Sequence, residues 1–541
     1  MRNTMKFFAL VLTLVLTFGV LTGCGGSKTV KEKGKYTYWV TMSGSSSQTL
    51  EKYDDMFMYQ ELEKRTGIDV DFIHPSKGST GNEAFQILLT SSDMPDMVEY
   101  SWKSYPGGPD AAIDNKVIIS LNEYMKEAAP NYYAYMEGEK AADNGKLYKV
   151  QSITEKGNYY GFQNLNFGTY RGFSGLYIRK DLLDKWGLEV PVTIDDWTEV
   201  FKVAKENGIK KPLTGGSGLF AITGSELFNI AWDVAKDYYI MDGKIKFGPA
   251  EAKYKEYIAQ MADWYKNGYI DPDFITNDSN VIQGNMTNGT SIATSGYVGS
   301  GMGVLLPAME EKDPNYSLVA CPHPVLKEGN VSLFQEVQPE SNDPAIAITY
   351  QCGKDDAERY KEAMTWCDYL YSDEGIILKS FGVKGVTYNE EVQADGSVKY
   401  KYIISSPEEQ EKIGAHSVEA ALYHYLRPAN SPGFNQHSDY LEGFYPYEQQ
   451  KEALKIWNTH VEEAKKHVMP TMSYTDEEAT KTAEINTKIR EKFNADIMDI
   501  IRNEISIDKY DSIVDKAMKD GFDELVSIHQ AAYDRYLANL K

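Results

Sequence analysis

The chain has 541 residues, far more than the ~150 of an ordinary single domain, so we expect two or more folded lobes. Its 79 acidic and 56 basic residues give a net charge of -23, which repels phosphate backbones and argues against a nucleic-acid partner. Four cysteines without CxxC spacing argue against a disulfide framework and a zinc module. The 39 tyrosines and 8 tryptophans are unusual, because such rings can stack on sugars or peptides while remaining wettable.

The first residues have the organisation of an export signal. Arg2 and Lys6 precede an uncharged, mainly apolar run over 7–20, which is shorter than the ~20 residues of a membrane-spanning helix. The next four residues, LTGC, resemble the lipobox of bacterial lipoproteins, in which the signal is cleaved before a cysteine that receives a diacylglycerol. We therefore expect a signal peptide over 1–23, a lipid on Cys24 and a flexible tether over 24–35. The alternative is an ordinary cleaved signal followed by a chance cysteine.

A first α/β unit is predicted from residue 36 onward. Residues 36–40 have the composition of a strand, and the helical pattern from about residue 50 ends at Gly67. Apolar and acidic residues then alternate over 68–72 as in a strand, and a helix, Pro95 and a further strand near 96–100 follow. This alternation of strands and helices is typical of a parallel sheet, in which ligands bind beyond the carboxyl ends of the strands. The loops 43–48 and 100–105 are therefore expected at a ligand site.

A second α/β unit is predicted from about residue 160. Thr193 and Asp196 approximate a capping box, and the helix that follows carries an apolar stripe that includes Trp197 and ends at Gly208. Residues 289–303 indicate a strand that opens into a glycine-rich loop, and 345–350 indicate another strand. The last helical pattern, over 522–540, places His529 on its apolar stripe, so we expect a packing histidine there.

The order of these segments resembles the large-lipoprotein branch of the family 1 extracellular solute-binding proteins. The segments that carry the resemblance are RTGIDVDF, LLTSSDMPDMVEY, LYIRKDLLDKWGLEVPVTIDDWTEVF, GTSIATSGYVG, AMTWCDYLYSDEGIILKSFGVKGVTY and AAYDRYL. The resemblance implies an α/β, two-lobed periplasmic-binding-protein-like fold of type II, with a hinge and a ligand cleft between the lobes. It implies lobe 1 over 36–160 plus about 320–388, and lobe 2 over 161–319 plus about 389–541 with the C-terminal helices.

The resemblance also implies a carrier for an ABC importer and not an enzyme. The lipid would hold the protein on the extracellular face of a Gram-positive cell membrane, where separate permease subunits receive the ligand. An oligosaccharide is favoured over a peptide, and we expect a monomer that uses no cofactor or metal. A peptide-binding receptor and a secreted glycan-active enzyme remain alternatives, because a pair of catalytic carboxylates could be present among so many acidic residues. Neither HExxH nor GxSxG occurs in the chain.

A cleft that binds and releases its ligand intact needs ring faces for stacking and a few polar groups for orientation. Candidates in the first lobe lie in loops after two predicted strands. Candidates in the second lobe lie in the loop after the first crossing, on a helical pattern and after a predicted strand. The resemblance implies an aromatic platform at Tyr297, while the guanidinium of Arg171 could hold a carboxylate or a row of hydroxyls. Each candidate could instead be a packing or surface residue. The eight candidates are Ser43, Ser45, Tyr100, Trp102, Tyr170, Arg171, Trp232 and Tyr297.

Overall fold

A computed structural model describes residues 35–76, 79–137, 140, 145–166, 168, 170–435 and 439–541. The predicted signal peptide, the lipid on Cys24 and all of the tether except its last residue lie outside the described residues. Within the described ranges, no helix combines the length and the apolar character needed to cross a bilayer.

The first lobe is built on a six-stranded sheet with the order β13-β4-β10-β3-β1-β2. Parallel pairs join β1 to β3 and β13 to β4, whereas β10 runs antiparallel to both β3 and β4. The sheet is therefore mixed. The long strand β10 runs antiparallel to both of its neighbours and lies between the early strands β1 to β3 and the pair of β4 and β13. The strands are β1 (Lys35–Trp39), β2 (Asp69–Ile73), β3 (Met97–Tyr100), β4 (Phe162–Asn166), β10 (Ser341–Ile348) and β13 (Gly433–Asn435).

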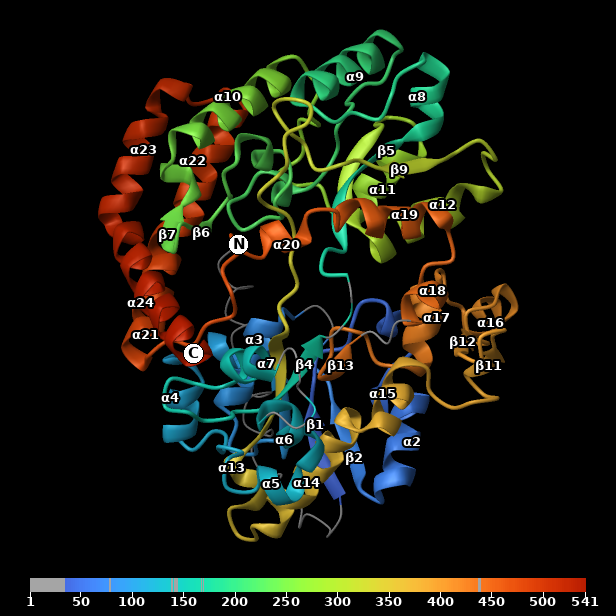
Figure 1. Cartoon of the computed structure of the whole chain (residues 1–541), viewed down its shortest axis with the longest axis vertical. Helices are drawn as coiled ribbons and strands as arrows, with labels where there is room; N and C mark the ends of the chain where they lie inside the picture. Colours follow the sequence, from blue (N-terminus) through green and yellow to red (C-terminus); the bar gives the residue numbers. More distant parts are fainter. Residues whose placement is uncertain are drawn as a thin grey trace, which may run out of the picture. The chain divides into compact units, whose positions relative to one another are not determined.

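Helices surround this sheet, as the lower half of Figure 1 shows. The first of them ends at Gly67 as predicted, because a left-handed residue (φ 70°) terminates it. Aromatic side chains fill the core beside it: the rings of Tyr59 and Trp366 stack with their centroids 5.7 Å apart. The helices are α2 (Phe57–Thr66), α3 (Gly81–Leu89), α4 (Gly108–Asp114), α5 (Met125–Ala128), α6 (Pro130–Glu137), α7 (Gly145–Ser152), α13 (Tyr350–Gly353), α14 (Glu358–Asp368), α15 (Asp373–Ser380), α16 (Pro407–Ile413), α17 (Val418–Tyr425) and α18 (Tyr440–Phe444).

The second lobe contains a three-stranded antiparallel sheet with β5 (Ser174–Arg179) between β8 (Ala293–Tyr297) and β9 (Leu318–Ala320). The predicted capping box is confirmed, because Thr193 and Asp196 exchange side-chain-to-backbone hydrogen bonds and Trp197 is fully buried on the helix that they open. The helices of this lobe are α8 (Lys180–Trp186), α9 (Ile194–Glu206), α10 (Ala252–Lys266), α11 (Ser279–Thr287), α12 (Gly303–Glu310), α19 (Glu448–Trp457), α20 (Val461–Ala464), α22 (Glu491–Ile501) and α23 (Tyr510–Ala517).

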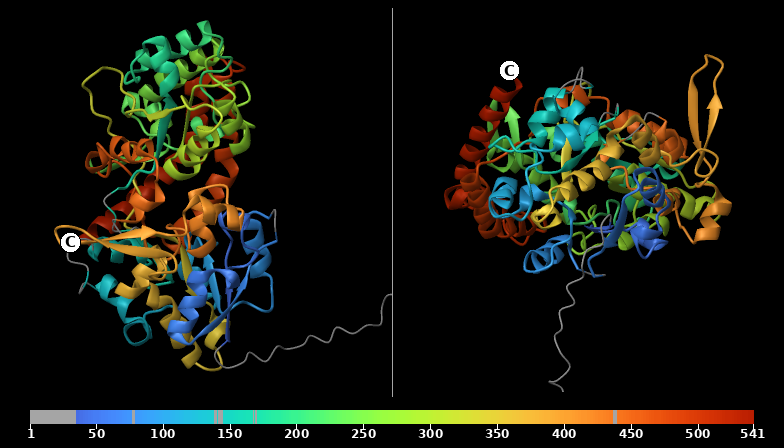
Figure 2. Two further views of the ribbon diagram at one scale, coloured as in Figure 1. Left: turned by 90° about the vertical axis from the view of Figure 1, so that its right-hand side faces the viewer. Right: turned by 90° about the horizontal axis from the view of Figure 1, so that it is seen from below.

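Two hairpins stand apart from the main sheets. The first consists of β6 (Tyr238–Met241) and β7 (Lys244–Phe247), and the second of β11 (Tyr388–Val392) and β12 (Val398–Tyr402). The β11–β12 hairpin extends away from its neighbours in the right-hand view of Figure 2.

The chain passes between the lobes after β4 and before β5, in the segment 321–340, and again between α18 and α19. The predicted ranges placed residues from about 389 onward on the second lobe, but residues 433–435 form β13 of the first sheet. The physical reason is that Phe434 is buried there against the ring of Tyr135, 4.2 Å away between centroids. Similarly, β4 extends the first lobe to Asn166, a few residues beyond the predicted crossing.

Two C-terminal helices contact both lobes. α24 (Asp523–Leu540) packs on β7 and on α7, and α21 (Asp476–Ile485) packs on α4 and continues toward α22. The prediction of a packing histidine is confirmed: His529 is 9% exposed, and its Nδ1 lies 2.8 Å from the hydroxyl of Tyr474.

Candidate functional site

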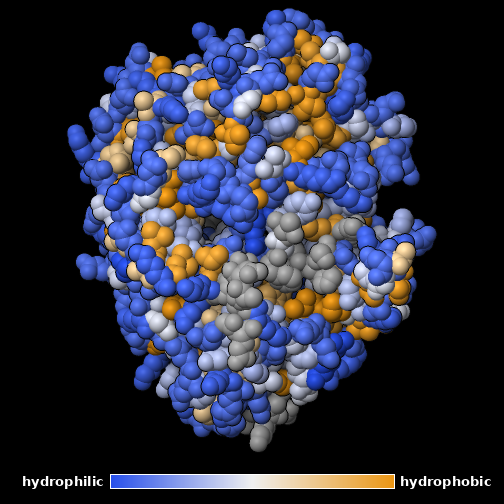
Figure 3. Space-filling view, viewed as in Figure 1, coloured by the Kyte–Doolittle hydropathy of each residue, from blue (hydrophilic) through white to orange (hydrophobic). Residues whose placement is uncertain are grey.

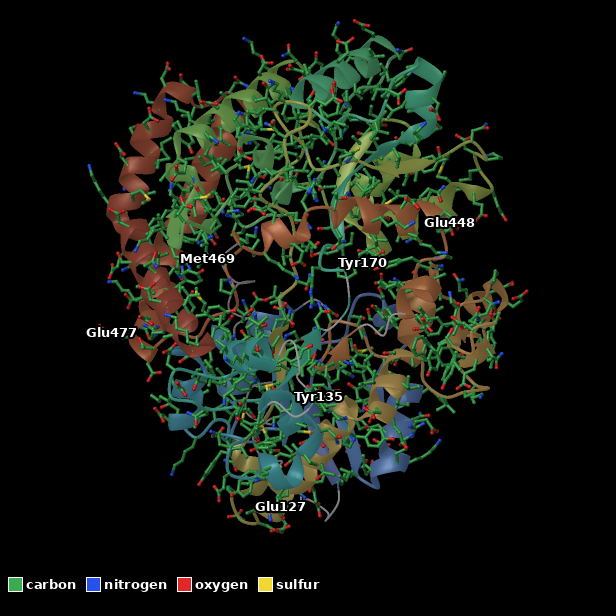
Figure 4. The ribbon with its side chains drawn as sticks, in the orientation of Figure 1. Glu127, Tyr135, Tyr170, Glu448, Met469 and Glu477 are labelled. Atoms are coloured by element: carbon green, nitrogen blue, oxygen red, sulfur yellow. The ribbon has the colours of Figure 1, made fainter. Side chains whose placement is uncertain are left out.

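The carboxyl end of β8 faces a cavity of about 330 Å³, which we call the Tyr297 cavity. It is bounded by a loop of the second lobe, by β6, by the second crossing and by the segment after α20. Figure 4 labels Met469, one of its lining residues, beside β6 and β7, and Tyr170 below α19. The lining residues are Thr223, Gly224, Ser225, Glu226, Ala235, Tyr238, Tyr239, Tyr297, Phe334, Gln335, Glu336, Val337, His467, Val468 and Met469.

Tyr297 is held at this cavity by the last pair of the β5–β8 ladder, in which it stands opposite Ser174. The backbone N–H of the next residue, Val298, donates to the carbonyl of Phe173 at 2.9 Å. The Tyr297 side chain remains 51% exposed, so one ring is available beside the cavity. The nearby carboxylate of Glu336 is the main cause that raises the pKa of the Tyr297 hydroxyl, and burial adds to it.

Glu336 is fixed by the start of β5. Its Oε2 accepts hydrogen bonds from the backbone N–H of Phe173 at 3.0 Å, and from the N–H and hydroxyl of Ser174, both at 2.8 Å. Its Oε1 accepts one hydrogen bond, from Nε2 of Gln338 at 2.7 Å. A carboxylate oxygen has two lone pairs, so Oε1 can accept a further donor.

A buried lysine supports the loop that lines another part of the cavity. Lys236 is fully buried, and its ammonium donates to the carbonyls of Gly218 at 3.2 Å and Leu219 at 2.6 Å. Burial lowers the pKa of Lys236 to about 7, and Glu226 opposes that shift. Burial likewise raises the pKa of Glu226, against the attraction of Lys236. The loop packs tightly, because a Cβ on Gly224 would lie 1.9 Å from the Gly218 carbonyl oxygen.

Arg171 lies in the first crossing and not at a free surface of the cleft. Its side chain is occupied: NH1 donates to the carbonyl of Asn166 at 3.2 Å, and NH2 lies 3.7 Å from the carboxylate of Glu340. The backbone of the two crossings is joined as well, since the N–H of Gln338 donates to the carbonyl of Arg171 at 2.8 Å. Arg171 is 4% exposed. The structure therefore places this predicted contact residue inside the junction, where it links the two crossing segments.

Asn458, just after α19, adds a third segment to this junction. Its Oδ1 accepts from the backbone N–H of Arg171 at 2.7 Å and of Gly172 at 2.9 Å, and its Nδ2 donates to the carbonyl of Gly172 at 2.7 Å. The neighbouring carbonyl of Trp457 accepts from Nε2 of Gln335 at 2.8 Å. The junction therefore extends to a side chain that lines the Tyr297 cavity.

A second cavity of about 210 Å³ lies on the other side of the turn that follows β8, and we call it the Glu419 cavity. The predicted residue Ser45 donates to Oε1 of Glu419 at 2.6 Å, and burial raises the pKa of that carboxyl group against this hydrogen bond. A Cβ on Gly299 would lie 2.8 Å from Oε2 of Glu419. Ser43 bonds to the hydroxyl of Ser46 at 2.8 Å. The loop after β1 and the turn after β8 thus meet at Glu419.

Three predicted contact residues lie in packed cores. Trp102 is fully buried because the 3₁₀ turn after β3 folds back and lets its Nε1 donate to the carbonyl of Val98 at 3.2 Å. Tyr100 is 9% exposed and stacks on Phe85, with centroids 3.5 Å apart. Trp232 is 5% exposed and packs on another ring of the second core. The ring faces of these three residues are therefore occupied by the protein itself.

Several residues of the Tyr297 cavity were not among the sequence candidates. Tyr239 and Phe334 form a buried edge-to-face pair with centroids 5.2 Å apart, and His467 lies near Phe334. Glu336 and Phe334 come from the irregular second crossing, where no period in the sequence marks a site. The only available signal was that a segment joining two lobes borders the cleft. Among the described residues, no group of three or more metal-ligating side chains comes together.

Comparison with known sequences assigns more than half of the chain to one family. The family model for bacterial extracellular solute-binding proteins matches residues 44–377. The fructooligosaccharide ABC transporter substrate-binding protein FusA of Streptococcus pneumoniae is 26% identical over 298 residues, which are 49% of this chain and 53% of FusA. The aligned region thus spans about half the length of that relative. Lipoprotein LipO of Bacillus subtilis is 24% identical over 401 residues, which are 72% of this chain and 74% of LipO.

Solved structures extend the likeness in fold to nearly the whole chain. FusA in complex with kestose has a TM-score of 0.71 at 19% identity, covering 93% of this chain and 100% of that one. The alginate-binding protein AlgQ2 also has a TM-score of 0.71, at 18% identity, covering 92% of this chain and 98% of that one. At these identities the comparison establishes the two-lobed α/β fold, as predicted.

Proposed function

We propose that this chain, which belongs to the family of bacterial extracellular solute-binding proteins, captures an oligosaccharide in the Tyr297 cavity and delivers it to an ABC permease. The observation that carries the proposal is the exposed ring of Tyr297, placed at the end of a strand and beside a cavity with apolar and polar walls that the second crossing borders. The relatives add support, because FusA is by name a fructooligosaccharide-binding component of an ABC transporter.

The cavity offers the two kinds of contact that a sugar uses. The Tyr297 ring gives a face for stacking, and Glu336 gives an acceptor for hydroxyl groups at its Oε1. Residues 334–337 belong to a segment that joins the lobes, so a movement of one lobe against the other changes the wall of the cavity. Binding and release then need no bond-making residue, and the ligand leaves unchanged.

The N-terminal residues complete the proposal. A lipid on Cys24 would hold a monomeric receptor at the extracellular face of the cell membrane, and the name of LipO, a lipoprotein, is in keeping with this. Cys24→Ser should leave the protein unlipidated and release it from membranes. A Cys24→Ser protein that is cleaved normally and still sediments with membranes would contradict the lipid anchor.

The test of ligand capture is calorimetric titration of the chain from Lys28 onward with fructooligosaccharides, malto-oligosaccharides and peptides. For the saccharide that binds, Tyr297→Ala should weaken affinity by about 5-fold or more, since a stacking contact is worth about 1 kcal/mol. Tyr297→Phe keeps the ring and should retain most of the affinity. Tyr400→Ala, on the β11–β12 hairpin, is the control for loss of a tyrosine elsewhere.

Product analysis separates the alternatives. Chromatography of each binding mixture should return the saccharide intact. Cleavage that Tyr297→Ala abolishes would indicate a glycan-active enzyme, and binding of peptides without saccharides would indicate a peptide receptor. Unchanged saccharide affinity in Tyr297→Ala would remove the Tyr297 cavity from the site.

A further inference from the structure

We infer that the Tyr297 cavity selects an uncharged saccharide and discriminates against glycans that carry carboxylate groups, such as oligouronates. This inference rests on the proposed function, because it concerns the ligand of the same cavity. The distinction matters within this fold, since one structural relative is by its title an alginate-binding protein, and alginate is a polymer of uronic acids.

The charged groups that line the cavity are of one sign. Glu226 and Glu336 are its carboxylates, and none of the described lining residues is a lysine or arginine. The lining histidine, His467, is already engaged, because its Nδ1 lies 3.0 Å from the carbonyl of Ile240 and its Nε2 lies 3.4 Å from Glu463. Both ring nitrogens of His467 therefore face groups of the protein itself.

Three cations of the surrounding segments are also unavailable to a ligand. Lys236 lies fully buried behind the loop, where its ammonium donates to two carbonyls and faces Glu226. Arg171 is 4% exposed and ties the crossings through Asn166 and Glu340. Arg490 is paired with Asp237, 2.6 Å away, next to β6. None of these three cations presents a free donor to a ligand carboxylate.

The neutral polar groups of the cavity also favour an uncharged saccharide. Gln335 lines the cavity with its amide orientation fixed, since Nε2 donates to the carbonyl of Trp457. Its Oε1 is buried and has no hydrogen-bond partner among the described residues. An acceptor of this kind needs a donor, which a sugar hydroxyl supplies and a carboxylate does not. Oε1 of Glu336 can likewise accept one more hydrogen bond.

The surroundings reinforce this selection. The Glu419 cavity also has a carboxylate as its one charged group among the described lining residues. The face shown in Figure 3 is covered mainly by hydrophilic residues, in keeping with a sequence that carries a net charge of -23. Without a cationic partner, a uronate in the cavity would give up hydration of its charge and gain only like-charge repulsion.

The first experiment compares trisaccharides of equal length by calorimetry with the chain from Lys28 onward. The uncharged set contains kestose, maltotriose and mannotriose, and the charged set contains trigalacturonate and trimannuronate. We expect at least one uncharged trisaccharide to bind at least 10-fold more tightly than either uronate, with little dependence on salt. A uronate that binds more tightly than every uncharged trisaccharide would overturn the inference and leave the proposed function standing. Binding of peptides alone would overturn both.

Charge variants at the rim test the cause. Ser225 is exposed on the cavity loop, and Ser225→Lys adds an ammonium where the wild type has none. We expect it to raise the ratio of uronate to uncharged-saccharide affinity about 3- to 10-fold at low salt, with the gain shrinking as salt is added. Ser225→Gln controls for bulk, and Ser397→Lys on the β11–β12 hairpin controls for net charge. A ratio that is the same in Ser225→Lys and Ser397→Lys would refute the lining charge as the cause.

Discussion

Replacing Asn458 should loosen the junction of the two crossings. Its Oδ1 is the acceptor for two backbone N–H groups, those of Arg171 and Gly172, and its Nδ2 donates to the carbonyl of Gly172. Asn458→Ala removes these three bonds and a fourth, which Nδ2 donates to the carbonyl of Leu454 at 2.8 Å. With about 1 kcal/mol for each lost acceptor at this partly buried position, we expect the free energy of unfolding to fall by about 2 kcal/mol, or somewhat more.

Asn458→Asp is the matched variant, because it keeps an acceptor for both N–H groups and loses only the hydrogen bonds that Nδ2 donates to the carbonyls of Gly172 and Leu454. Its loss should be about 1 kcal/mol, roughly half that of the alanine variant. Urea unfolding followed by tyrosine and tryptophan fluorescence measures both values. If Asn458→Ala unfolds at the wild-type urea midpoint, the junction does not depend on these bonds and the reasoning is refuted.

Three further predictions concern buried groups. Burial lowers the pKa of His529 to about 4, so the unfolded chain binds more protons than the folded one between pH 6.5 and 4. The free energy of unfolding should therefore fall by about 3 kcal/mol over this range. His529→Asn should reduce this fall in acid unfolding scans, and an unchanged slope would contradict the prediction. Glu99→Ala leaves the buried guanidinium of Arg427 without its carboxylate partner, and should lower the free energy of unfolding, measured in urea, by about 3–5 kcal/mol. Glu448→Ala, at an exposed ion pair, should change this free energy little. Equal effects of the two variants would refute the distinction. Trp102→Ala should lower the unfolding free energy by about 3–5 kcal/mol, and a stable variant with weakened saccharide binding would return Trp102 to the site.

The sequence was most informative where one short segment determines its own structure. The stop at Gly67 and the capping box of Thr193 are local, and both are confirmed. Strand β13 was not foreseen, because three residues are too few to show a period and its partner β4 lies more than 260 residues earlier. Pairing at that distance is decided by the packing of Phe434 and not by local preference.

The candidate site likewise contains residues that the sequence could predict and residues that it could not. Tyr297, the last residue of β8, lies at a cavity, as its position at the end of a strand predicts, and its contact with a ligand stays a prediction. The same rule misplaced Trp102, because the turn after β3 folds the indole back into the core. Glu336 and His467 could not be found by pattern, since they stand in irregular segments that meet only through tertiary packing.

The strand order of the two sheets sets the order in which a growing chain can complete them. The second sheet needs only residues 174–320, so all of its strands exist once that part of the chain has been made. The first sheet begins with Lys35 but lacks its outer strand until Asn435 has been synthesised. For some 115 residues after Ala320, the chain therefore holds a complete second sheet beside an unfinished first one. Until β13 arrives, β4 presents an open edge, and an open edge can pair with the wrong strand.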